Sequence, residues 1–180
     1  MTTIAYRDGV LAADTLATAG GVRAGYTLKV SRLYDGTLVG FAGRVACLGA
    51  VLRAAEEAAK AAGRAKTSLF SMDGSLFPVW PKEEYLLLCI TPDGSVGLNE
   101  GGDGFISLAL DGGYVAEGSG GLLATVAMDC GLSACEAVKA AIRRDTSSGG
   151  DVYYLELGGE GEPKKYYTPR TYKHVEAQIL

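Results

Sequence analysis

A threonine stands at position 2, directly behind the initiator methionine, in the run Met1-Thr2-Thr3-Ile4. Removal of Met1 would set the Thr2 hydroxyl beside a free α-amine, and such an amine titrates near neutrality. A threonine hydroxyl is a weak nucleophile by itself, but a base within proton-transfer reach activates it. Thr2 therefore indicates a hydrolase with an N-terminal nucleophile, if the rest of the chain supplies the partners that this chemistry needs.

Other common catalytic groups are scarce. The one histidine, His174, lies close to the end of the chain, which argues against a histidine-based triad and a His-rich metal site. The four cysteines, Cys47, Cys89, Cys130 and Cys135, form no C-x-x-C pair, so we expect buried free thiols and neither zinc nor disulfides. We expect no metal and no cofactor, and acid–base chemistry must use a base other than histidine.

The composition indicates one compact domain over residues 1–180, because 48% of the residues are hydrophobic and only 21% are charged. A net charge of -4 does not favour binding to nucleic acid or to an anionic membrane. No apolar run approaches the roughly 20 residues that span a bilayer, and the N-terminus lacks the features of a signal peptide. We therefore expect a cytoplasmic protein that binds neither nucleic acid nor membrane.

The first part of the chain is predicted to form short strands at 3–6, 10–13, 28–34 and 37–42. Asp8-Gly9 and Asp35-Gly36 are expected as two-residue hairpin turns between them. A run rich in alanine, leucine and glutamate then predicts a helix from Val45 to Ala62, which Gly63 ends.

Strands are expected again at 85–90, 95–98 and 105–110, after an irregular stretch from 65 to 81. Gly118-Ser119-Gly120-Gly121 opens a second helix through Met128, and a capping box of Ser133 and Glu136 opens a third that ends near Asp145. A strand at 151–157 follows, and Tyr166-Tyr167 begins one more. This order is not the alternating pattern of a parallel sheet, so it predicts an α+β fold with two antiparallel sheets facing each other and helices outside.

Six short motifs occur in one order along the chain: Thr2-Thr3-Ile4, Ala13-Asp14 with Thr18 close behind, Lys29-Val30-x-Arg32-Leu33, Gly40-Phe41-Ala42-Gly43, Gly118-Ser119-Gly120-Gly121 and Arg144-Asp145-x-x-Ser148-Gly149-Gly150. The ordered set resembles the catalytic β-subunit of the proteasome family, including its bacterial HslV-type relatives. The resemblance covers nearly the whole chain and implies the four-layer αββα sandwich of N-terminal nucleophile hydrolases. Met1 as the only leader residue fits the HslV-type branch, whereas the motif around Asp145 fits the proteasome branch, so the branch stays open.

The resemblance implies that Thr2 attacks a peptide carbonyl and forms an acyl-enzyme, which water then hydrolyses. Lys29 matches the family's active-site lysine, and Asp14 matches the carboxylate that keeps this lysine charged and in position. A buried ammonium near the nucleophile would lower the pKa of the neighbouring amine. A lysine and an aspartate on adjacent strands usually form only a surface pair of little energetic value. The catalytic roles of Lys29 and Asp14 therefore rest on their occurrence with Thr2 in the family's motif order.

Four further residues complete the expected catalytic set. Gly43 ends a strand just before a helix, where its N–H group suits an oxyanion hole. Ser119, Asp145 and Ser148 resemble the polar residues that orient the threonine amine in the family. The glycines around Ser119 also have a plain explanation as a helix opening, and the run lacks the Lys and Ser or Thr of a phosphate-binding P-loop.

Substrate contacts follow from the same resemblance. Thr18 and the backbone after Gly43 would bind an extended peptide as an added strand. The family's primary specificity pocket corresponds to a set of positions without charge, at Ala17, Thr27, Phe41, Val45 and Gly49. We therefore expect cleavage after apolar residues, with Phe41 limiting the depth of the pocket.

The implied function is that of a threonine endopeptidase that cleaves peptides or unfolded proteins. The resemblance further implies a homo-oligomeric double ring with an AAA+ unfoldase ATPase as a candidate partner. Two alternatives stay open: a catalytically inactive ring-forming structural or interaction protein, and a small-molecule amide hydrolase of the N-terminal nucleophile group. The latter would keep Thr2 without needing the peptide-binding residues.

Overall fold

The computed structural model describes residues 2–72, 76–77, 85–102 and 104–167. The first of two five-stranded sheets has the order β10 (Tyr114–Gly118), β1 (Thr3–Arg7), β2 (Val10–Asp14), β11 (Val152–Glu156) and β12 (Lys164–Lys165). The second has the order β5 (Val30–Arg32), β6 (Leu38–Gly43), β7 (Tyr85–Ile90), β8 (Val96–Glu100) and β9 (Phe105–Leu108). A separate hairpin pairs β3 (Leu16–Ala19) with β4 (Val22–Tyr26), and all of these strand pairs are antiparallel.

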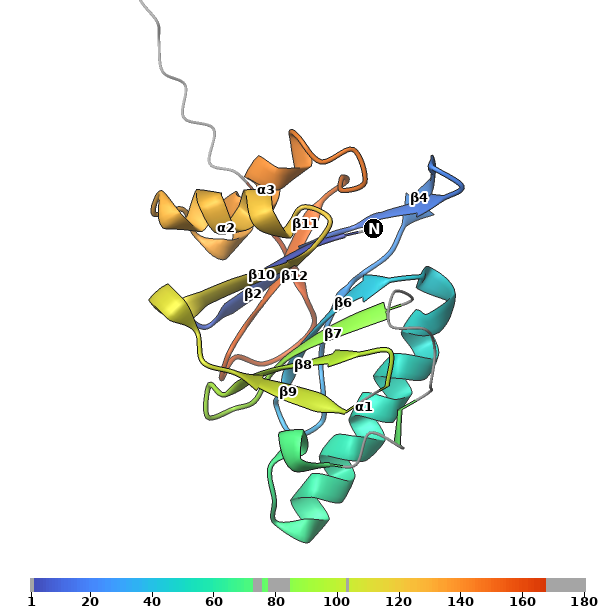
Figure 1. The fold of residues 1–180 in the computed structure, drawn as a ribbon, viewed down its shortest axis with the longest axis vertical. Helices are drawn as coiled ribbons and strands as arrows, with labels where there is room; N and C mark the ends of the chain where they lie inside the picture. Colours follow the sequence, from blue (N-terminus) through green and yellow to red (C-terminus); the bar gives the residue numbers. More distant parts are fainter. Residues whose placement is uncertain (1, 73–75, 78–84, 103, 168–180) are drawn as a thin grey trace, which may run out of the picture.

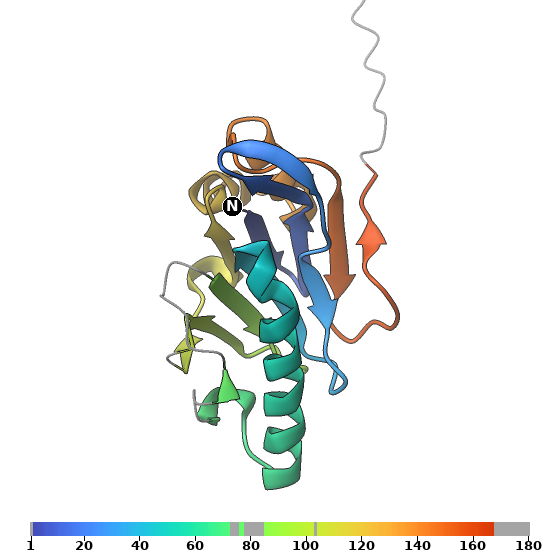
Figure 2. The same ribbon diagram turned by 90° about the vertical axis from the view of Figure 1, so that its right-hand side faces the viewer.

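The α-helices in the described residues are α1 (Val45–Ala65), α2 (Gly121–Asp129) and α3 (Ala134–Ile142). Short 3-10 turns occur at η1 (Leu69–Ser71) and η3 (Asp111–Gly113). In Figure 1 the pair α2 and α3 lies over the first sheet, and α1 lies on the far side of the second sheet. Figure 2 shows α1 running along that outer side. The expected four-layer αββα sandwich is confirmed.

Side-chain alternation along each strand divides the core among these layers, because successive residues of a strand point to opposite faces. In β1, Ile4 packs in the cluster between the two sheets, whereas Ala5 packs against α2 and α3. In β6, Leu38 faces the other sheet, whereas Phe41 packs in the cluster beneath α1. The sheets approach closely at Gly40, where a Cβ atom would lie 2.7 Å from Ile4 Cγ2.

The N-terminal elements match the expected order with three corrections. The turn Asp8-Gly9 is a two-residue hairpin, as Arg7 pairs with Val10. Asp35-Gly36, in contrast, lies in a longer connection, because Arg32 pairs with Leu38. The expected strand at 28–34 is confined to β5, and the hairpin of β3 and β4 was not predicted.

The first helix runs past Gly63 and ends at Ala65. The left-handed residue that ends it is Lys66, with φ of 53° and ψ of 43°. Gly63 has a packing role instead, since a Cβ atom there would lie 2.8 Å from the Tyr34 hydroxyl oxygen. Glycine at that helix position therefore leaves room for the Tyr34 hydroxyl group and does not end the helix.

The C-terminal half has the predicted capping box, in which Ser133 and Glu136 exchange hydrogen bonds at the start of α3. This helix ends at Ile142, before the predicted end near Asp145. Strand β10 was not predicted, and the last strand lies just before Tyr166. Part of the irregular stretch expected at 65–81, as well as Met1 and His174, lies outside the described residues.

Cysteine burial follows the prediction at three of four positions. Cys47, Cys89 and Cys135 are buried free thiols, and desolvation by burial raises the pKa of Cys135 to about 12. Cys130 is exposed, so its predicted burial was wrong. The residue directly follows α2, where the chain turns away from the core. In the part of the chain that the structure describes, no helix combines the length and the apolar character needed to cross a membrane.

Candidate active site

Thr2 lies at the end of the first sheet, immediately before β1, and is 2% exposed. The next residue, Thr3, pairs with Gly118 at the end of β10. Gly118 has φ of +89°, and a Cβ atom on it would lie 2.1 Å from the Thr2 carbonyl oxygen. Glycine is required at this position for two reasons, its left-handed backbone and its close approach to Thr2.

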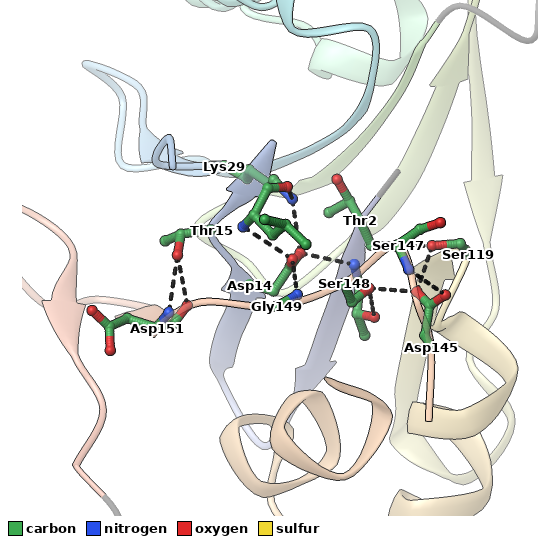
Figure 3. A network of polar contacts seen from close by, with 12 residues as sticks. Thr2, Asp14, Thr15, Lys29, Ser119, Asp145, Ser147, Ser148, Gly149 and Asp151 are labelled. Carbon is green, nitrogen blue, oxygen red and sulfur yellow. Dashed lines mark hydrogen bonds and ion pairs between the residues drawn. The ribbon is translucent and has the colours of Figure 1, made fainter. Parts of the chain in front are cut away.

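A buried lysine–aspartate pair, Asp14 with Lys29, lies beside this position (Figure 3). Asp14 ends β2, and its Oδ1 accepts hydrogen bonds from Lys29 Nζ at 2.9 Å and from Thr3 N at 3.0 Å. Its Oδ2 accepts from Leu16 N at 3.2 Å and from Gly149 N at 2.8 Å. Four donors therefore hold this carboxylate, which fixes its orientation.

Lys29 lies just before β5 and donates a second hydrogen bond to the Leu16 carbonyl oxygen at 2.7 Å. Desolvation by burial lowers the pKa of Lys29, and the charge and hydrogen bond of Asp14, with a smaller contribution from Asp145, oppose this shift. The ammonium thus releases its proton more readily than a surface lysine does. Such a group can serve as a local positive charge close to a reacting hydroxyl.

A second group, the serine–aspartate cluster, consists of Ser119, Asp145 and Ser148. Asp145 Oδ2 accepts hydrogen bonds from Ser119 Oγ at 2.6 Å and from Ser148 Oγ at 2.5 Å, while its Oδ1 accepts from Ser147 N at 3.1 Å. Burial by itself raises the pKa of Asp145, but these hydrogen bonds outweigh it and hold the pKa below its ordinary value. The carboxylate is therefore ionised at neutral pH.

Ser119 connects this cluster to the candidate nucleophile. Its hydroxyl oxygen lies 3.4 Å from the Thr2 carbonyl oxygen and 2.6 Å from Asp145. Because a serine has one hydroxyl hydrogen, the shorter and charge-assisted bond to Asp145 is the stronger one. Figure 3 draws Thr2 between Lys29 on one side and Ser119 on the other.

A cavity of about 420 Å³ opens at Thr2. Two further residues of the expected catalytic set, Lys29 and Gly43, line it. Five of the expected substrate-binding residues line it as well: Ala17, Thr18, Thr27, Phe41 and Val45. The structure thus brings residues from four separate parts of the sandwich to one concave surface.

The N-terminus of α1 opens toward this cavity. Gly43 has φ of 136°, a region that favours glycine, and Arg44 precedes the helix without a side-chain hydrogen bond to its first turn. No acidic residue lies in that first turn. Since N–H groups and the helix dipole favour negative charge here, this end of the cavity suits a developing oxyanion.

No protein-family model matches the chain, and no curated protein matches it. Among solved structures, the chain is similar to the eukaryotic HslV from Trypanosoma brucei, with a TM-score of 0.65 and 23% sequence identity. The similarity covers 86% of this chain and 98% of that one. This chain has the HslV fold. The expected fold is thereby confirmed over most of the length of both chains.

Within this HslV-like fold, one expected substrate-binding residue lies apart from the others. Gly49 is exposed on α1 and does not line the cavity, whereas Val45 and Leu48 do. At about 100° per residue, Leu48 and Gly49 lie on opposite sides of Val45 around the helix axis. The helix turns its Leu48 side to the cavity, and this orientation corrects the expectation for Gly49.

Three lining residues were not predicted: Leu16, Arg44 and Leu48. The two leucines extend the apolar part of the wall. Arg44 and Lys29 make the cavity partly cationic, which the uncharged set of expected positions did not indicate. Arg44 directly follows the glycine motif at Gly40–Gly43, and its place before the helix was the signal that could have revealed it.

A second cavity, of about 500 Å³, lies on another part of the surface. It shares Thr27 with the first cavity and is otherwise lined by Thr15, Tyr26, Leu28, Gly150, Asp151 and Tyr153. Thr15 Oγ1 is occupied by hydrogen bonds with Asp151 N and O, and the Asp151 carboxylate pairs with Lys165. Thr15 and Asp151 are thus already paired, and we place the candidate chemistry at Thr2.

Proposed function

We propose that this protein is a proteasome-like threonine endopeptidase, in which Thr2, freed by removal of Met1, attacks peptide bonds through an acyl-enzyme. One observation supports this proposal above all. Thr2 and the buried Lys29 of the lysine–aspartate pair line one cavity, on an HslV-like fold. A buried ion pair is a weak source of stability, so its position beside a buried threonine favours a chemical role.

In the proposed reaction the α-amine of the freed Thr2 accepts the proton of its own hydroxyl, and Oγ attacks the peptide carbonyl carbon. The Lys29 ammonium stabilises the alkoxide that develops, and by like-charge repulsion it keeps the amine neutral enough to act as a base. Asp14 holds Lys29 charged and in place.

The tetrahedral intermediate carries a negative oxygen, for which the Gly43 N–H group and the N-terminus of α1 are the proposed donors. The amine then gives its proton to the leaving nitrogen, the peptide C–N bond breaks, and an ester to Thr2 remains. Water attacks this ester with the same amine as base, releasing the acid product and the free hydroxyl. Asp145 and Ser119 orient the amine through hydrogen bonds.

The substrate in this proposal is an extended peptide that pairs with the backbone at Thr18 and after Gly43. An apolar side chain before the cleaved bond would contact Phe41, Val45 and Leu48. Phe41 is 2% exposed and stacks on Tyr85 with ring centroids 6.5 Å apart. Its ring is therefore well packed and forms the base of the pocket. Basic side chains are disfavoured, because Lys29 and Arg44 line the same cavity.

We further propose a homo-oligomeric double ring with an AAA+ unfoldase ATPase as partner, on the strength of the family resemblance and the HslV-like fold. Light scattering and electron microscopy of the purified protein test the ring. A monomer that cleaves short peptides would contradict the proposed ring but not the proposed reaction of Thr2.

The decisive experiment combines two measurements: mass spectrometry, which identifies the first residue of the mature chain, and covalent labelling of the active site. The mature chain should begin at Thr2, hydrolyse a fluorogenic peptide and form one covalent adduct with a peptide epoxyketone or boronate. Thr2→Ala should assemble normally, remain unlabelled and lose at least about 10⁴-fold in kcat. A trimmed chain that neither labels nor cleaves would support the inactive structural protein, and hydrolysis of small amides alone would support the amide hydrolase.

A further inference from the structure

Thr3, the residue after the candidate nucleophile, contacts both polar groups of the site. Its backbone N–H donates to Asp14 Oδ1 at 3.0 Å, and its Oγ1 lies 2.7 Å from Ser148 Oγ. The residue is fully buried, with 0% exposure. Thr3 thereby joins the lysine–aspartate pair to the serine–aspartate cluster across the position of Thr2.

The direction of the side-chain hydrogen bond follows from counting hydrogens. Ser148 Oγ lies 2.5 Å from Asp145 Oδ2, and an ionised carboxylate can only accept. Ser148 therefore uses its one hydroxyl hydrogen toward Asp145, and Thr3 must donate to Ser148. The result is a directed chain from Thr3 through Ser148 to Asp145, in which each bond strengthens the next.

The backbone at Gly120 packs closely against the Thr3 side chain. A Cβ atom on Gly120 would lie 1.9 Å from Thr3 Oγ1 and 3.2 Å from Thr3 Cβ. The glycine run between β10 and α2 thus closes directly over the Thr3 side chain, while Gly118 approaches the Thr2 carbonyl. Both glycines thus pass close to Thr2 and Thr3 and leave no room for a larger residue at either position.

We propose that Thr3 is a positioning residue for the reaction of Thr2. Its hydroxyl orients Ser148 and Asp145, which connect to Thr2 through Ser119. Its backbone N–H anchors the carboxylate that holds Lys29. The role rests on the proposed function, because it has meaning only if Thr2 is the nucleophile. It gives a role to a residue that stands in the first sequence motif but was not assigned one there.

The role has a consequence for the pH dependence of activity. Without the Thr3 hydroxyl, the Ser148 bond to Asp145 weakens, and the pKa of Asp145, which hydrogen bonds from Ser119 and Ser148 hold down against desolvation, rises. The charged groups around Asp145 are Lys29, the exposed Arg143 and Arg144 at the end of α3, and the amine of the freed Thr2. None of these is changed by a substitution at Thr3. The step of the pH profile that Asp145 sets, which lies on the acid side of the amine's own titration, should therefore move to higher pH.

The test compares Thr3→Val, which removes the hydroxyl at constant shape, with Thr3→Ser, which keeps it. Thr37→Val is the matched control: Thr37 is also buried, and its Oγ1 donates to Asp35 Oδ2 at 3.1 Å in a turn away from the site. We measure kcat, KM and the pH profile on a fluorogenic peptide, and normalise to the fraction of Thr2 that an epoxyketone labels, so that unfolded protein is not counted.

Thr3→Val should lower kcat by about 10- to 100-fold with KM nearly unchanged, and move the Asp145 step of the pH profile to higher pH. Thr3→Ser should restore most of the rate, and Thr37→Val should change neither kcat nor the profile. An active wild-type protein with an unaffected Thr3→Val variant, or with Thr3→Ser as impaired as Thr3→Val, would overturn the positioning role alone. A wild-type protein that is correctly trimmed but inactive would overturn the proposed function and this role with it.

Discussion

Asp14 Oδ1 lies 2.9 Å from Lys29 Nζ, with the two side chains 0% and 3% exposed. Removing two charges from water costs several kcal/mol per ion, and the attraction between them offsets this cost only when further hydrogen bonds complete the site. Here three backbone N–H groups and one carbonyl oxygen do so. The pair is therefore intact but sensitive to the loss of either member.

Asp14→Asn should lower the free energy of unfolding by about 3–5 kcal/mol, because it leaves the Lys29 charge buried without its partner. The new amide group would also turn an N–H donor toward groups that themselves donate. Chemical denaturation measures the loss. Glu57→Gln, which breaks the exposed pair with Lys60 at 3.0 Å, should cost less than about 1 kcal/mol, and equal losses in both variants would contradict this reasoning.

The alkaline limb of the activity profile should lie below the ordinary lysine value of 10.5, because desolvation lowers the pKa of Lys29 in the folded protein. Activity that needs the ammonium is present below this lowered pKa and is lost as pH rises through it. Asp14 opposes the shift, so Asp14→Asn should move the limb to still lower pH. An identical alkaline limb in folded Asp14→Asn would show that Lys29 does not control it.

Gly118→Ala should lower the free energy of unfolding by more than the strain of a left-handed backbone alone explains. Gly131 has the same φ of +89° with nothing within 4 Å of its Cβ position, whereas a Cβ on Gly118 would meet the Thr2 carbonyl at 2.1 Å. Gly131→Ala should therefore cost about 1–2 kcal/mol in unfolding free energy and leave kcat unchanged. Gly118→Ala should cost more and lower kcat as well, and matching effects of the two variants would count against the close contact.

Peptides with a basic residue before the cleaved bond should be the slowest of an apolar, acidic and basic panel. Arg44→Gln should raise kcat/KM for basic peptides about fivefold, since two like charges 4 Å apart in water repel by about 1 kcal/mol. Arg64→Gln, in the last turn of α1, is the control and should change nothing. Basic peptides cleaved as fast as apolar ones would contradict the proposed specificity.

Asp145 should contribute to acid stability in a defined direction. Its folded pKa lies below the ordinary value of 3.8, because hydrogen bonds to its ionised form outweigh desolvation. The stabilisation is thus complete above that value and is lost as pH falls through the lowered folded pKa. Asp145→Asn should unfold with a shallower dependence on pH in this acid window, and an unchanged slope would exclude Asp145 as a contributor.

Local patterns in the chain were sufficient for the elements whose residues show strong periodicity or clear caps. The short apolar runs of β1, β2, β6 and β7, the alanine-rich α1 and the capping box at Ser133 are of this kind. The hairpin of β3 and β4 was missed because β4 is mostly exposed and has no apolar alternation. Strand β10 was missed because its glycine-flanked, half-buried sequence becomes a strand only by pairing with β1.

The sequence by itself determined the chemistry that is available: a threonine behind Met1, one lysine and one aspartate in the family's order, and glycines where backbones must approach. Only the tertiary structure decided which groups meet, because Asp14 collects donors from Thr3, Lys29 and Gly149 across two sheets. The same packing joined Thr3 to Ser148 and turned Leu48, and not Gly49, toward the cavity. Periodicity acts over a few residues, whereas strand register and sheet packing are non-local, and a buried charge persists only where that packing brings all its partners together.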